Sequence, residues 1–251
     1  MRSLAVFIFS VLAFAASPLA AQEIVYETVV LEEAAWLDGG SERYLSTQPA
    51  VVPQADVPDA IAEYGPFRVF DEGRAALVDV TDSRSPGAFR AMLRDFPGIA
   101  VIEMIDCPGT DDDRANLQLG RMIRARGMVT YVPAGGSVRS GAVELFLAGS
   151  HRIIDDGAEF AVHAWIDEDG RQAQDYAPDA PENRKYLAYY RDMGMGEGQA
   201  LAFYAMTNSA PFEQALWLDA AEMRGWLDTG EPGEVQKQPL LANLDLSIPL
   251  H

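Results

Sequence analysis

Short apolar runs alternate with amphipathic stretches along most of this chain. Residues 74–80 have the composition of a strand, and residues 99–105 form a near-continuous apolar run, typical of a strand buried on both faces. Between them, residues 86–95 begin with Pro86 and carry apolar residues at helical spacing, so the pattern predicts a helix. The first regular elements are therefore expected to be a strand, a helix and a strand.

The same alternation continues toward the C-terminus. A helix is expected from residues 111–113 to about 126, because Gly127 follows its last apolar position and can end it. Strands are then expected at residues 129–132 and 160–163, separated by a small-residue helix at 140–148. Three further helices are expected near residues 182–191, 196–207 and 219–226. Strands that alternate with helices predict an α/β fold with a largely parallel sheet.

The N-terminal region has a different character. Residues 1–21 show the pattern of a secretory signal peptide, with Arg2, an apolar stretch and a short segment that predicts cleavage after Ala21. The apolar stretch is shorter than the roughly 20 residues that a bilayer-spanning helix needs. We therefore expect an exported protein, periplasmic or secreted. Residues 22–66, with a strand predicted at 24–31, are expected to form an extended lead-in, and residues 67–251 one domain.

The composition excludes several classes of function. The chain has 38 acidic and 19 basic residues, a net charge of −19. Loss of residues 1–21 removes one basic residue and makes this −20, which disfavours nucleic acid and anionic membranes as partners. The single cysteine, Cys107, cannot form an internal disulfide. Zinc, redox and phosphate-loop motifs are absent from the sequence, so we expect no metal and no cofactor.

Two acidic groups could suggest cation sites. Three consecutive aspartates, residues 111–113, stand where a helix is expected to begin, so helix capping explains them better. Asp167, Asp169 and Gly170 resemble part of a calcium loop, but the Glu at its twelfth position is missing. We expect both groups to be structural.

The best candidate for chemistry is Ser140. It lies between a turn that contains Gly135 and Gly136 and the small-residue helix, where the helix dipole favours a developing negative charge. The alternatives are that Ser140 caps this helix, or that Ser137 is the relevant hydroxyl. His163 follows at the end of an apolar strand and is the candidate base; alternatively, it is a strand histidine bonded to backbone.

Taken together, residues 101–165 resemble the core of the Clp protease proteolytic subunit and the wider crotonase-like superfamily. The closest resemblance is to secreted, Clp-protease-like bacterial proteins. It implies a spiral of β-β-α units with a largely parallel sheet. Aligned on Phe-Leu-Ala-Gly at residues 146–149, the resemblance implies that Ser140 is the nucleophile and His163 the base. The backbone amides of Gly109 and Gly141 would form the oxyanion hole.

The chain departs from the family pattern at three places. In Cys-Pro-Gly-Thr, Cys107 and Thr110 stand where the family has Ser and Gly, and Thr110 would be restricted if that position required a positive φ. The orienting Asp of the family aligns with Ala215. The nearest acid, Glu213, is the substitute that we consider first, with Asn208 and Asp219 as further options.

The sequence thus predicts a secreted serine hydrolase that acts on peptides or small acyl substrates without a cofactor. The alternative is a catalytically silent binding or scaffold protein that keeps the fold. An ATP-dependent unfoldase is not expected as a partner, because an exported protein meets no ATP supply. The resemblance implies a homo-oligomer, and residues 186–206 are rich in aromatic residues and methionine that would form core or an oligomer face.

Overall fold

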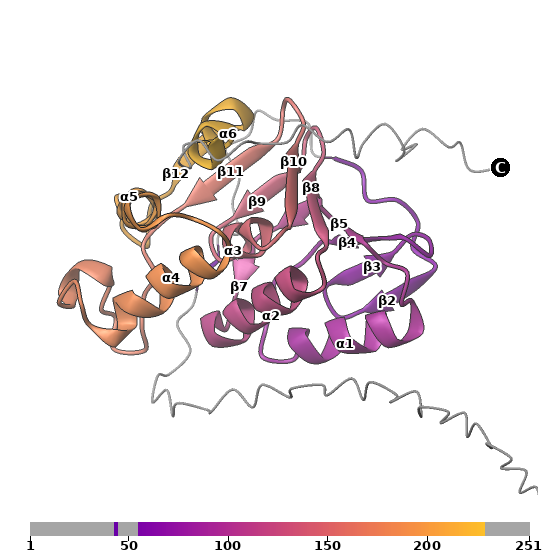
Figure 1. Ribbon diagram of the computed structural model, residues 1–251, viewed down its shortest axis with the longest axis horizontal. Coiled ribbons are helices and arrows are strands. Elements are labelled where there is room, and N and C mark those ends of the chain that lie inside the picture. The colour runs from indigo at the N-terminus through magenta and orange to yellow at the C-terminus, as the bar shows by residue number, and fades with distance from the viewer. Residues whose placement is uncertain (1–42, 45–54, 229–251) are drawn as a thin grey trace, which may run out of the picture. The chain divides into compact units, whose positions relative to one another are not determined.

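The computed structural model describes residues 43–44 and 55–228, all of which belong to one compact unit, Asp38–His251. The predicted signal peptide, the predicted strand at 24–31 and most of the lead-in lie outside the described residues. Within the described part, strands and helices alternate as the sequence predicts, and the strands form two main sheets (Figure 1).

The larger sheet has six strands in the order β10-β8-β5-β4-β3-β2. Neighbours are parallel from β10 to β4, and the hairpin β2–β3 adds antiparallel strands at the edge. The strands are β2 (Ala62–Tyr64), β3 (Phe67–Val69), β4 (Arg74–Leu77), β5 (Val101–Met104), β8 (Val129–Val132) and β10 (His151–Ile154). All four residues of β5 are buried, as the apolar run predicts.

The smaller sheet has the order β12-β11-β9-β6, with only β12 antiparallel to its neighbour. Its strands are β6 (Asp106–Cys107), β9 (Ser137–Arg139), β11 (Glu159–Val162) and β12 (Leu216–Asp219). The strands β5, β8 and β10 are each followed in the chain by a strand of this smaller sheet. Because a helix follows two of these strand pairs, the topology is a winding of β-β-α units, and the predicted α/β class is confirmed.

A third, two-stranded pairing joins β1 (Arg43–Tyr44) to β7 (Gly109–Thr110) in antiparallel register. On its other side, Thr110 forms a parallel bridge with Thr81. The short strand β7 therefore has backbone neighbours on both sides.

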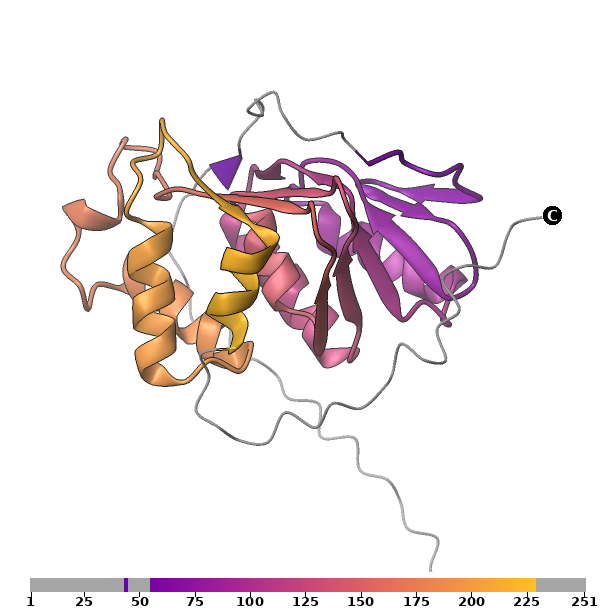
Figure 2. The same ribbon diagram turned by 90° about the horizontal axis from the view of Figure 1, so that it is seen from above.

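The helices begin and end close to the predicted positions. They are α1 (Ser85–Asp95), α2 (Asp113–Ala125), α3 (Ala142–Leu147), α4 (Pro181–Asp192), α5 (Glu197–Thr207) and α6 (Ala220–Asp228). The Asp112 side chain accepts the Ala115 N–H at 3.0 Å, so the capping role predicted for the aspartates is confirmed. In Figure 2, α4, α5 and α6 gather at the end of the unit away from β2–β4.

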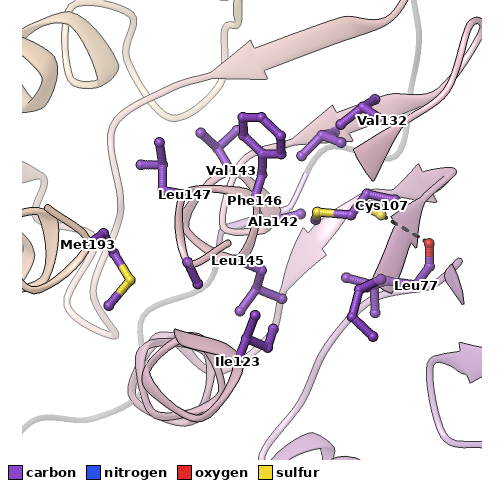
Figure 3. Packing of buried hydrophobic residues seen from close by; sticks show 14 of the residues in the cluster. Leu77, Cys107, Ile123, Val132, Ala142, Val143, Leu145, Phe146, Leu147 and Met193 are labelled. Atoms are coloured by element: carbon purple, nitrogen blue, oxygen red, sulfur yellow. Dashed lines mark hydrogen bonds between the residues drawn. The ribbon is translucent and has the colours of Figure 1, made fainter. Parts of the chain in front are cut away.

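The core lies around α3, whose six residues are all buried (Figure 3). The ring centroids of Phe146 and Phe160 are 5.1 Å apart, which joins the helix to β11. On its other side, the Tyr189 hydroxyl donates to the Glu144 carbonyl at 2.6 Å. This contact requires glycine at position 120, because a Cβ there would lie 1.9 Å from the Tyr189 hydroxyl oxygen.

The structure shows which of the two roles left open by the sequence most of the aromatic residues in 186–206 have. Of the aromatic residues in 186–206, Tyr186, Tyr189, Tyr190 and Phe203 have no exposed surface, so they form core. These four rings therefore take the core role, and a homo-oligomer stays a prediction from the resemblance in sequence.

None of the helices in the described part of the chain combines the length and the apolar character needed to cross a bilayer.

The packing of α3 gives a stability prediction. Phe146→Ala removes a fully buried ring, so we expect it to lower the free energy of unfolding by about 3–5 kcal/mol. Leu201→Ala, at a side chain that is 49% exposed, should cost less than about 0.5 kcal/mol. Urea denaturation followed by circular dichroism measures both values. Similar losses in the two variants would contradict the assignment of α3 to the core.

Candidate active site

The pairing of two parallel strands brings Ser140 and His163 to the same edge of the smaller sheet. Strands β9 and β11 are in register, with Arg139 opposite Ala161. The pairing continues by one bond, because the Ser140 N–H donates to the Ala161 carbonyl at 2.7 Å. Ser140 directly follows β9 and His163 directly follows β11. The two candidate residues therefore occupy the carboxyl ends of adjacent strands.

Ser140 has an unusual backbone conformation. Its φ of 53° is the only positive φ at a residue other than glycine in the described part of the chain. An L-residue in this region costs on the order of 1–3 kcal/mol and is retained where the surroundings impose it, often at functional sites. The side chain is fully buried, and Oγ has no hydrogen-bond partner. Gly141, not Ser140, is the N-cap of α3, so the capping alternative is wrong.

The competing hydroxyl, Ser137, is already engaged. It donates to Glu159 Oε1 at 2.8 Å and accepts from Arg139 Nη1 at 2.8 Å. With both its proton and a lone pair used, Ser137 is a poor nucleophile, and Ser140 remains the candidate.

The His163 ring is fully buried, and its surroundings favour one tautomer. Nδ1 lies 2.8 Å from the Ala164 carbonyl oxygen. A carbonyl can only accept, so Nδ1 carries the proton and Nε2 is left with a lone pair, the form that a general base requires. The Ala164 N–H donates to the Ala210 carbonyl at 2.8 Å, and the Phe212 ring packs edge-on against the imidazole with 5.1 Å between centroids.

The two glycines implied as oxyanion donors are connected by one buried amide. Asn116 on α2 donates through Nδ2 to the Gly141 carbonyl at 2.6 Å. Its Oδ1 accepts from the Thr81 hydroxyl at 2.9 Å, and the Thr81 N–H donates to the Gly109 carbonyl at 3.0 Å. This network links the carbonyls of Gly109 and Gly141, each of which directly follows a candidate oxyanion amide in the chain. The sequence analysis missed Asn116, although its signal was present as a polar residue among the buried positions of α2.

The unusual Cys-Pro-Gly-Thr sequence is accommodated without strain at Thr110. Gly109 has φ of 132°, which suits glycine, whereas Thr110 does not have a positive φ. The Thr110 hydroxyl donates to the Thr81 carbonyl at 3.1 Å. The Cys107 thiol is buried and donates to the Leu77 carbonyl at 3.1 Å, as Figure 3 shows, and burial raises the pKa of this thiol. Cys107 is therefore not a competing nucleophile.

Three side chains, those of Glu213, Asp219 and Asn208, are candidates for the group that orients the His163 ring. Glu213 is exposed, whereas the His163 ring is buried. Asp219 is also exposed, and its carboxylate accepts the Glu222 N–H at the start of α6 at 2.8 Å. Asn208 donates to the Tyr204 carbonyl at 2.8 Å. The imidazole Nδ1 itself is in hydrogen-bond contact with a backbone carbonyl, that of Ala164.

Between residues 55 and 228, no group of three or more histidine, cysteine, aspartate or glutamate side chains is placed to hold a metal ion. The site offers groups suited to acyl transfer: a hydroxyl, an imidazole and two glycine-containing turns whose carbonyls belong to one hydrogen-bond network.

No protein-family model matches the chain, and no curated protein sequence does. Several solved structures are similar in chain trace. A membrane protease specific for a stomatin homologue from Pyrococcus horikoshii is 15% identical with a TM-score of 0.38, over 60% of this chain and 67% of that one. A ClpP1 mutant from Listeria monocytogenes is 14% identical with a TM-score of 0.34, over 62% and 88%. A protein described as an enoyl-CoA hydratase from Streptomyces coelicolor is 13% identical with a TM-score of 0.37, over 71% and 69%.

The buried amide of Asn116 gives a prediction that does not depend on catalysis. Asn116→Ala leaves the Gly141 carbonyl and the Thr81 hydroxyl without this partner, so we expect a loss of about 1–3 kcal/mol in unfolding free energy. We also expect faster hydrogen exchange of the backbone amides at residues 140–142. Asn183→Ala removes a comparably buried amide on α4 and is the matched control. Equal exchange at 140–142 in the two variants would contradict the role of Asn116.

Proposed function

We propose that this protein is a serine hydrolase that acts on peptides or small acyl compounds, with Ser140 as nucleophile and His163 as general base. The backbone amides of Gly109 and Gly141 would bind the oxyanion. The observation that carries this proposal is the Ser140 turn: a non-glycine residue with positive φ whose hydroxyl is buried and unbonded at a strand end next to that of His163. A structural serine would be expected to use its hydroxyl.

The proposed reaction follows from these groups. Ser140 Oγ attacks the substrate carbonyl carbon while His163 Nε2 takes the hydroxyl proton, and the negative charge develops on the carbonyl oxygen. The imidazolium then gives its proton to the leaving group as that bond breaks, which leaves an acyl-enzyme. Water, deprotonated by the same imidazole, releases the acid and restores Ser140. The Ala164 carbonyl, by accepting from Nδ1, holds the ring in the required tautomer through both steps.

A catalytically silent binding or scaffold protein is the second candidate, and one observation favours it. Ser140 and His163 both have no exposed surface, and Gly109 is also buried. A substrate can reach these groups only if the surrounding chain moves. A scaffold protein that keeps this fold would show the same buried Ser140 and His163.

The two candidates differ in their reaction with a fluorophosphonate probe, which modifies activated serines. For the hydrolase we expect labelling of one residue, Ser140, and its loss in Ser140→Ala and in His163→Ala. Folded protein that takes up no probe would support the scaffold.

The role of Glu213 is decided by the same assay. Glu213→Gln should leave the labelling rate unchanged if the Ala164 carbonyl alone orients His163. A decrease of about tenfold or more would instead show that the Glu213 loop turns toward the imidazole and that this carboxylate is the third residue.

We further propose that the protein is exported, with cleavage after Ala21. The sequence pattern of residues 1–21 supports this. Intact-mass measurement of the protein purified from its native cells should give a chain that begins at Gln22. Recovery of a mature protein that still carries Met1 would overturn the proposal, and with it the argument against an ATP-dependent unfoldase as partner.

A further inference from the structure

A buried ionic cluster lies on one face of the smaller sheet, directly before the Ser140 turn. Arg139 is only 3% exposed. Its Nη2 donates to Asp106 Oδ1 at 2.8 Å and its Nη1 to Ser137 Oγ at 2.8 Å. Ser137 in turn donates to Glu159 Oε1 at 2.8 Å. The cluster therefore ties together the three parallel strands β6, β9 and β11.

The ion pair between Arg139 and Asp106 runs diagonally across strands β9 and β6. In the strand register, Asp106 lies opposite Ser137 and Ser137 lies opposite Glu159, so these three form a row across the sheet. Arg139 is two residues further along β9 and reaches back to Asp106. A diagonal contact of this kind opposes sliding of β6 along β9, in addition to the backbone pairing of the two strands.

Strands β6 and β9, which this ion pair joins, lead into the two halves of the candidate site. Asp106 is three residues before Gly109, and Arg139 is the residue immediately before Ser140. Any slip between β6 and β9 would change the distance from the Gly109 amide to the Ser140 hydroxyl. Displacements on the order of 1 Å in such sites are enough to lower a rate by about a hundredfold.

We propose that Arg139 is a positioning residue, whose ion pair with Asp106 sets the Ser140 turn and the Gly109 turn in register with each other. The inference rests on the proposed function for its effect on chemistry, but the fixed register itself does not depend on catalysis. In this role Arg139 donates to Asp106 and Ser137 and acts on the site through the strands that it joins.

Arginine is suited to this role by shape. Its planar guanidinium presents two donors in a fixed fork, so it can bind Asp106 and Ser137 at once. A lysine keeps the charge but offers a single nitrogen on a flexible chain. Arg139→Lys should therefore retain part of the effect, and Arg139→Gln none of it.

The test compares Arg139→Gln, Arg139→Lys and Asp106→Asn with the matched control Arg152→Gln. Arg152 is also a largely buried arginine, and it bonds the carbonyls of Leu147 and Met193 away from both turns. Two quantities are measured in the full chain. Hydrogen exchange reports the backbone amides at residues 109–110 and 140–142, and a fluorophosphonate series gives the maximal labelling rate of Ser140 separately from the probe affinity.

For Arg139→Gln and Asp106→Asn we expect exchange to accelerate by about tenfold at both turns together. The maximal labelling rate should fall by about tenfold or more while the probe affinity stays within about twofold. Arg139→Lys should give exchange and labelling rates between those of Arg139→Gln and of the unmodified protein. Arg152→Gln should show the same exchange as the unmodified protein at both turns, even if its melting temperature is lower.

The outcomes separate the two proposals. If the unmodified protein takes up no probe, the hydrolase proposal fails, and the positioning role is judged on exchange alone. Exchange at both turns that stays unchanged in Arg139→Gln, or that rises equally in Arg152→Gln, overturns the positioning role. Should Arg139→Gln not fold, Asp106→Asn decides, because the Asp106 side chain is 30% exposed and its amide variant is tolerated more easily.

Discussion

The parallel pairing of β9 with β11 is the constraint on which the candidate site depends. It places the residues that follow both strands at one edge of the smaller sheet, and the Ser140 N–H extends the pairing by one hydrogen bond. A shift of one residue would turn the side chains of β11 to the opposite face and move His163 away. The alternation along β11 opposes such a shift, because Phe160 belongs to the core and Glu159 to the ionic cluster.

The left-handed backbone of Ser140 is maintained by contacts from several directions. The Ala161 carbonyl holds its N–H, Asn116 holds the carbonyl of the next residue, and Arg139 anchors the strand before it. A local conformation that costs on the order of 1–3 kcal/mol persists only when its neighbours leave no alternative. Each of these contacts comes from a different part of the chain, so the conformation of the turn depends on the smaller sheet and α2 together.

The sequence predicts the fold class and most of the helices because their signals are local. The apolar run of β5 and the amphipathic pattern of α2 each span a whole element. Strands β6, β7 and β9 were missed because two or three residues are too few to show a period, and they exist only through pairing with distant segments. Strand β10 was missed because it lies at a sheet edge, where its residues are partly exposed and show no alternation.

The candidate site was predictable in part, because some of its sequence signals are also local. The position of Ser140 after a glycine-containing turn and of His163 after an apolar strand can be read from the chain. Whether a hydroxyl caps a helix or stays unbonded depends on the backbone angle, and the sequence does not show that Ser140 is left-handed. The orienting group of His163 was sought among side chains, but the structure offers the carbonyl of the next residue, a backbone atom that no residue type reveals.

The complete burial of Ser140 and His163 has a kinetic consequence. If only an open minority of molecules can react, the observed rate is the intrinsic rate multiplied by the open fraction, so a population of about 1% lowers reactivity about a hundredfold. Reactivity would then respond to anything that shifts this equilibrium. Urea well below the unfolding midpoint would speed the reaction, and a ligand selective for the open form would activate the protein without touching the serine.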